Sequence, residues 1–194
     1  IMQTDEELMQ AVRDGSEAAF EAILARHQGG VYGFFLRMTH NSATAEDQAQ
    51  EVFVRLFRNA ATYCPSAKFT TYLYRIAHTV LIDWSRRASR RDKADSLDAP
   101  APLGGSWHEM VPSHERRPEE VLQEREETAR IHDAIGTLPD THRVVFLLAV
   151  QEDMKYSDIA VAVGIPEGTV KSRFHHAVAA LRDKLTRARA ARPA

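Results

Sequence analysis

The segment over residues 156–185 constrains the fold more than any other part of the chain. Ser157 is suited to cap a short helix, and Gly164 can adopt the left-handed conformation that a tight turn requires. Pro166 suits the start of a second, longer helix that begins near Glu167. A short helix, a glycine-containing turn and a longer helix form a helix-turn-helix. The second helix of this motif enters the DNA major groove, so the sequence predicts a DNA-binding unit.

The longer helix of this unit has two chemically different faces. At about 100° per residue, one face is apolar and predicted to pack on a core, and it consists of Val170, Phe174, Ala177, Val178, Leu181 and Leu185. Side chains that can pair with bases or phosphates gather around the start of the helix, and the candidate DNA contacts are Tyr156, Thr169, Lys171, Ser172, Arg173, His175 and His176. A surface helix with merely solvated charges is the alternative interpretation.

The rest of the chain also has helical periodicity, with no alternating strand pattern. Apolar residues recur at helical spacing in several segments, namely 20–38, 52–57, 69–84 and 121–148. Thr44 is predicted to cap the second of these helices. We therefore expect an all-α fold of two small helical domains joined by a flexible linker, over residues 1–91 and 119–194, with the helix-turn-helix in the second.

Residues 92–118 interrupt the periodicity and predict the linker between these domains. The segment is rich in turn-forming residues, namely Pro100, Pro102, Gly104, Gly105, Pro112 and Pro118. Trp107 and Met110 are unusual in a linker. They either pack on a neighbouring domain or contact a partner, and the sequence does not decide between the two.

Charge and composition exclude several classes of protein. The net charge of −2 conceals a gradient, because residues 94–127 are strongly acidic and residues 167–194 are basic, as a DNA-binding end would be. Cys64 is the only cysteine, which excludes an internal disulfide and a cysteine-rich zinc site. No apolar run approaches the roughly 20 residues of a membrane span, so we expect a cytoplasmic protein without membrane insertion. No nucleophile–base set, phosphate loop or metal cluster is visible, so we expect no enzyme, cofactor or metal.

Short motifs stand in both halves of the chain. The sequence EGTVKSR over 167–173, preceded by YSDIA over 156–160, resembles region 4 of bacterial RNA polymerase sigma factors, in the extracytoplasmic-function (ECF) group of the sigma-70 family. In the first half, AED at 45–47 with QEVF at 50–53 resembles region 2. The segment FTTYLYRIA over 69–77 resembles the part that reads and melts the promoter −10 element. The likeness covers roughly residues 16–91 and 118–186.

The resemblance implies a role for each half of the chain. Region 2 would bind the clamp helices of the largest polymerase subunit, through Asp47, Gln50, Glu51 and Arg55. It would also read and melt the −10 element, for which the matching residues are Phe69, Thr71, Tyr72, Arg75, Thr79, Arg86 and Arg87. The loop over 60–68 resembles the family's base-capture loop. Region 4 would hold the −35 element and contact the flap of the second-largest subunit. An anti-sigma factor is the implied regulator.

The chain also departs from the family pattern. Positions that are often basic in relatives are His176, Val178 and Ala179 here, and His78-Thr79 stands where an asparagine is common. We hypothesise weaker phosphate attraction and a pH sensitivity near neutrality that depends on His176. Trp84 is interpreted as core, with base stacking as the alternative. Two other classes stay open: a conventional helix-turn-helix regulator and a pure interaction protein.

Overall fold

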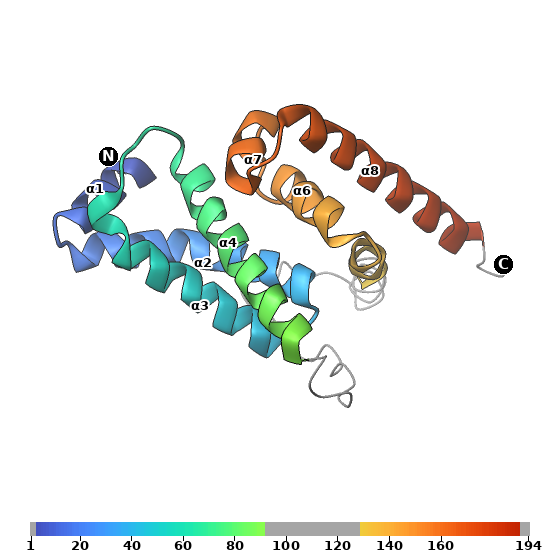
Figure 1. The fold of residues 1–194 in the computed structure, drawn as a ribbon, viewed down its shortest axis with the longest axis horizontal. Helices are drawn as coiled ribbons and strands as arrows, with labels where there is room; N and C mark the ends of the chain where they lie inside the picture. The colour runs from blue at the N-terminus through green and yellow to red at the C-terminus, as the bar shows by residue number, and fades with distance from the viewer. Residues whose placement is uncertain (1–2, 92–128, 191–194) are drawn as a thin grey trace, which may run out of the picture.

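The computed structural model describes residues 3–91 and 129–190, and every regular element in those ranges is a helix (Figure 1). This confirms the all-α prediction. The N-terminal group comprises α1 (Asp5–Arg13), α2 (Glu17–Thr39), α3 (Ser42–Arg58), the short 3-10 helix η1 (Ala60–Thr62) and α4 (Phe69–Arg91). The C-terminal group comprises a helical segment over 129–136, α6 (Asp140–Val150), α7 (Tyr156–Val163) and α8 (Glu167–Ala190).

The predicted linker, with Trp107 and Met110, lies outside the described residues, as does the predicted start of the second domain at residue 119. In the part of the chain that the structure describes, no helix combines the length and apolar character that crossing a membrane requires.

Side-chain caps start the first three helices. Thr4 and Glu7 form a capping box at α1, and Ser16 accepts the Ala19 N–H at the start of α2. Asn41 caps α3 by accepting the N–H of Thr44 at 2.9 Å. The prediction that Thr44 is the cap is therefore wrong. The helix begins earlier because Asn41 supplies the acceptor.

The core of the N-terminal group surrounds α2, which packs against α1 and α3, while α3 packs against α4. The apolar faces that periodicity predicts are largely buried here. Fully buried side chains include Ile23, Val31, Phe34, Phe35, Val52, Leu56 and Leu73. Phe57, which the same pattern places in the core, is instead 53% exposed. It lies near the end of α3, and its ring meets that of Phe20 in α2 with centroids 5.1 Å apart.

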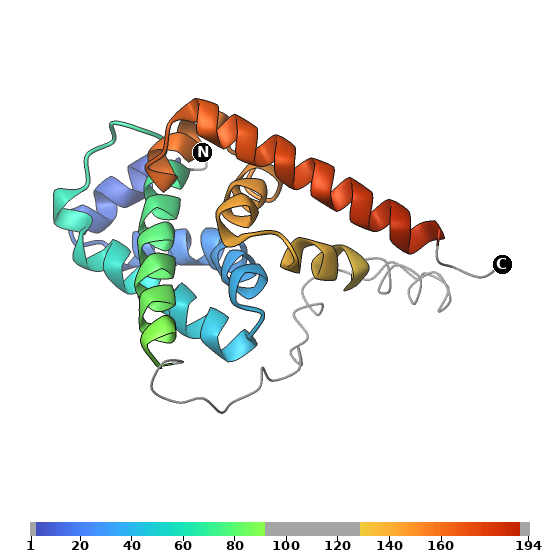
Figure 2. The same cartoon turned by 45° about the vertical axis from the view of Figure 1, so that its right-hand side comes forward.

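The two groups pack against each other rather than standing apart. In Figures 1 and 2, α7 lies beside the first half of α4, and α2 also contacts α6. Lys68 pairs with Asp158 at 3.3 Å, and the Gln151 side chain donates to the Gly30 carbonyl at 3.2 Å. The joint is close-fitting, since a Cβ on Gly136 would come within 2.7 Å of the His40 ring.

Candidate nucleic-acid interface

The helix-turn-helix is formed by α7 and α8, as predicted. Gly164 ends α7 with φ of +73°, the left-handed conformation that favours glycine, and its N–H donates to the Ala160 carbonyl at 2.9 Å. The Pro166 carbonyl accepts the N–H of Thr169 at 2.9 Å as α8 begins. Ser157 does not cap α7, because the helix begins one residue earlier and its capping position is Lys155, which makes no side-chain cap bond.

The two faces of α8 differ as expected. Val170, Ala177 and Leu181 are buried, and the Phe174 ring lies 5.5 Å from the ring of Tyr156. Tyr156 is therefore half-buried and supports the recognition helix as well as bordering its surface. The polar candidates divide by exposure: Lys171, Ser172, His175 and His176 are exposed, whereas Thr169 and Arg173 are half-buried.

A histidine from α6 joins this surface, and sequence reasoning missed it. The His142 ring stacks on that of His176, with centroids 6.0 Å apart and planes inclined by 24°. Burial, followed by the charges of Arg173 and His176, lowers the pKa of His142. No sequence signal links the two rings, because they are brought together by the packing of α6 on α8.

The predicted −10 contacts on α4 divide between surface and interior. Arg75, Thr79, Arg86 and Arg87 are exposed and Tyr72 is half-buried, so a nucleic acid could reach them. Phe69 and Thr71 are only 1% and 2% exposed. In this arrangement they cannot contact DNA, because Phe69 packs its ring against His27 at 5.1 Å. The alternation of exposed and buried side chains follows the helical period, which puts both residues on inward faces.

The predicted polymerase-facing residues lie on α3. Asp47 and Gln50 are exposed, whereas Glu51 and Arg55 are half-buried. The Arg55 guanidinium donates to Glu51 at 2.7 Å and to Asp83 of α4 at 2.9 Å. These bonds, the one to Glu51 first, raise the pKa of Arg55. Arg55 thus ties α3 to α4, and Asp47 and Gln50 are the members of the set that are free to face outward.

An apolar groove runs beside these residues between α2 and α3, with a volume of about 740 Å³. Val54 and Phe57 line it and are 41% and 53% exposed. Acidic side chains of Glu17, Glu21 and Glu46 also line the groove. Sequence analysis did not identify it, because Phe57 fits the core periodicity and only the structure shows that nothing in the described chain covers it.

The two candidate DNA surfaces converge in this structure. Arg86 of α4 and Arg173 of α8 line one cavity of about 200 Å³ between the two groups, together with Trp84 and His78. Trp84 is half-buried, in keeping with the interpretation as core. One residue from each predicted DNA-contacting set, Arg86 for the −10 element and Arg173 for the −35 element, therefore lines the same cavity.

The fold is that of a two-part helical protein whose second part contains a helix-turn-helix. The family model "Sigma-70 region 2" matches residues 23–91, and "Sigma-70, region 4" matches residues 128–181. The chain is 32% identical to the ECF RNA polymerase sigma factor SigW of Bacillus subtilis, over 90% of this chain and 92% of that protein. It is also 32% identical to the RNA polymerase sigma factor CarQ of Myxococcus xanthus, over 91% and 95% of the two chains. The chain belongs to the ECF group of sigma-70 family sigma factors.

Two solved structures share this fold. CnrH in complex with the cytosolic domain of CnrY gives a TM-score of 0.69 at 21% identity, covering 95% of this chain and 98% of that one. The sigma factor RpoE of Bartonella quintana, solved with the anti-sigma factor NepR, gives 0.68 at 17% identity and covers 86% and 96%. At these identities the likeness concerns the fold alone.

Proposed function

We propose that this chain is an alternative sigma factor that directs core RNA polymerase to specific promoters and opens them for initiation. The observation that carries the proposal is that one sigma-family chain has two surfaces suited to DNA contact, one on α8 and one on α4. The α8 face presents exposed Lys171 and Ser172 at the start of a recognition helix, and α4 presents exposed Arg75 and Thr79. Arginine, lysine and serine side chains are suited to base edges and phosphates. The chain would itself carry out no bond chemistry and need no cofactor.

The proposed division of labour follows the two groups. Residues 1–91 would bind polymerase and act on the −10 element, and residues 119–194 would hold the −35 element. Residues 92–118 would join these two domains. Asp47 and Gln50 are the preferred polymerase contacts, because their side chains are exposed. The apolar groove beside Gln50 supports this placement, since exposed apolar patches typically mark surfaces that a partner covers.

Promoter binding would require the two groups to separate. Elements named −10 and −35 lie about 25 base pairs apart, which at 3.4 Å per step is roughly 85 Å. Arg86 and Arg173 share one cavity here, so they cannot meet both elements in this arrangement. A fully extended segment spanning residues 92–128 can reach roughly 120 Å, which is enough. The packed form would then be the state without promoter.

We further propose that an anti-sigma factor controls the chain, by holding the surfaces that polymerase needs. Membership of the ECF group supports this proposal. A cytoplasmic location follows from the same scheme, because core polymerase and promoter DNA are met there.

Run-off transcription with purified core polymerase and genomic fragments tests the proposal. We expect discrete, promoter-specific transcripts only when the chain is added. A conventional helix-turn-helix regulator would instead bind a palindromic site as a dimer without polymerase, and it would yield no new start sites. A pure interaction protein would give neither DNA binding nor transcripts.

A further inference from the structure

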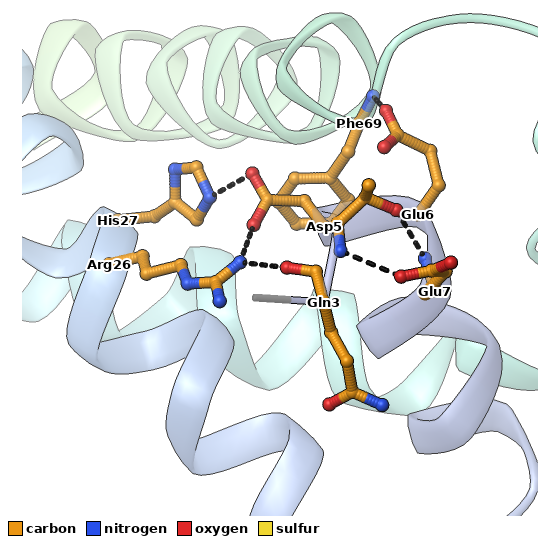
Figure 3. Close-up of polar contacts among 8 residues, drawn as sticks. Gln3, Asp5, Glu6, Glu7, Arg26, His27 and Phe69 are labelled. Carbon is orange, nitrogen blue, oxygen red and sulfur yellow. Dashed lines mark hydrogen bonds and ion pairs between the residues drawn. The ribbon is translucent and has the colours of Figure 1, made fainter. Parts of the chain in front are cut away.

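The first turn of α1 reaches across the fold to the start of α4 (Figure 3). The Glu6 carboxylate accepts the backbone N–H of Phe69 at 2.9 Å, across 63 residues of sequence. Phe69 is the first residue of α4, the helix that carries the proposed −10 contacts. The helix nearest the N-terminus, which the sequence motifs leave without a role, therefore contacts the proposed melting element.

The start of α4 lacks a local cap that could replace this contact. The first N–H groups of a helix have no partner within it, and a Ser, Thr, Asp or Asn side chain usually accepts one of them. The capping position here is Lys68, whose carbonyl accepts the Tyr72 N–H and whose side chain is a donor only. A carboxylate at this end also interacts favourably with the helix dipole. Glu6 thus caps α4 from another helix.

Neighbouring Asp5 fixes Glu6 in place by anchoring α1 to α2. One Asp5 oxygen accepts from Arg26 at 2.8 Å, and the other lies 2.8 Å from Nε2 of His27. The His27 ring in turn lies 5.1 Å from the ring of Phe69, and Figure 3 labels both residues beside Asp5. We call Asp5, Glu6, Arg26, His27 and Phe69 the clasp.

Two buried polar groups close to the clasp lack hydrogen-bond partners among the described residues. These groups are the hydroxyls of Tyr63 and Thr71. Burial, followed by the Glu6 charge, raises the pKa of Tyr63. Buried polar groups without a hydrogen-bond partner are costly, so they lower the stability of the local conformation. Residues 63–68, which lie between η1 and α4, therefore depend on outside contacts for their conformation.

We propose that the clasp is a positioning device for promoter opening. Glu6, held by Asp5, sets the conformation of residues 63–68 and of the first turn of α4, and so determines how fast the −10 element is melted. The inference rests on the proposed function, because it assigns a role within promoter opening. Glu6 acts through Phe69 and the loop and does not itself touch DNA.

Amide hydrogen exchange, measured by NMR on the full chain without polymerase, tests the contact itself. Glu6→Ala should speed exchange at the Phe69 amide by about tenfold, the scale of a lost helix cap. Glu6→Gln keeps an acceptor oxygen and should give a smaller change. Glu7→Gln is the matched control, because it removes an equal charge from the same turn but keeps an acceptor oxygen for the Thr4 N–H, so that the capping box of α1 is preserved. Equal exchange at Phe69 in Glu6→Ala and wild type would overturn the clasp.

The rate of open-complex formation by the reconstituted holoenzyme tests the function. On duplex promoter, Glu6→Ala should slow opening by roughly threefold to tenfold, while Glu7→Gln leaves it near the wild-type rate. On a template already melted at −10, the two variants and the wild type should initiate alike. An equal loss on both templates would mean a general structural defect and would overturn the positioning role. If the wild-type holoenzyme shows no promoter specificity, the proposed function fails, and this role fails with it, whatever the exchange data show.

Discussion

The guanidinium of Arg143 in α6 donates a hydrogen bond to the carbonyl oxygen of Met38 in α2, at 3.2 Å. Arg143 is only 6% exposed, and its other donors reach three carbonyls of its own group, those of Ile135, Gly136 and Leu138. Burial lowers the pKa of this guanidinium, and Asp140 opposes the effect. One buried cation thus organises the loop before α6 and joins the two groups of helices.

Replacing Arg143 should destabilise the protein strongly. Arg143→Leu leaves four carbonyl oxygens without their charged donor, so we expect the free energy of unfolding to fall by about 2–3 kcal/mol. Urea denaturation followed by circular dichroism measures this. Arg182→Leu is the control, since Arg182 is exposed on α8 and its loss should change stability by less than about 0.5 kcal/mol. Equal midpoints and slopes for the two variants would refute the role of Arg143.

Acid should weaken the joint between the groups. Burial lowers the pKa of His78. The pKa of His40 is also lowered from 6.5, by burial first and by the charge of Arg143 second, while the charges of Asp140 and Asp133 raise it. The unfolded chain therefore binds these protons more readily than the folded one, and stability is lost as pH falls below about 6.5. His78→Gln should flatten the decline in the free energy of unfolding between pH 7 and 5.5. Parallel curves for variant and wild type would show that His78 contributes nothing.

The apolar groove should carry part of the polymerase affinity. Phe57→Ser removes a 53% exposed ring, so folding should be nearly unaffected. Affinity for core polymerase should drop by about tenfold to thirtyfold, as for an aromatic anchor lost from an interface. Val161→Ser, at a 57% exposed position on α7, is the control and should bind as wild type. Binding of Phe57→Ser at wild-type affinity would remove the groove from the interface.

The hypothesis of pH-sensitive promoter binding through His176 stays a prediction, now with His142 beside it. A protonated imidazole would add positive charge opposite phosphates, so the hypothesis predicts a higher promoter affinity at pH 6 than at pH 8. His176→Ala should show a flatter profile, whereas His175→Ala should retain the slope. Fluorescence anisotropy with labelled promoter DNA measures both. An identical profile for His176→Ala and the wild type would dismiss the idea.

Local signals in the sequence were sufficient for much of the fold. The start of α4 at Phe69 and the left-handed Gly164 follow from periodicity and turn chemistry, which act over a few residues. The positions of helix caps were harder to predict. Asn41 and Thr44 are both residue types that cap helices well, and only one of them can cap α3. The family motifs, rather than periodicity, indicated the division into two DNA-reading halves.

Contacts between distant segments could not be predicted in the same way. Nothing in the local pattern says that Glu6 caps α4, although the absence of a capping side chain at Lys68 is a signal that could have been noticed. The burial of Thr71 and the exposure of Phe57 depend on how whole helices pack. The meeting of Arg86 with Arg173 in one cavity depends on the joint between the groups, which no single-helix pattern encodes.

In the proposed function, two separate surfaces of one chain read two promoter elements. A double-mutant cycle tests it most directly, by combining Lys171→Ala or Arg75→Ala with base-pair substitutions in each element and measuring initiation by the holoenzyme. We predict that Lys171→Ala couples only to the upstream element and Arg75→Ala only to the downstream one, each by about 1 kcal/mol or more. Strictly additive effects, or coupling of both residues to the same element, would contradict the account.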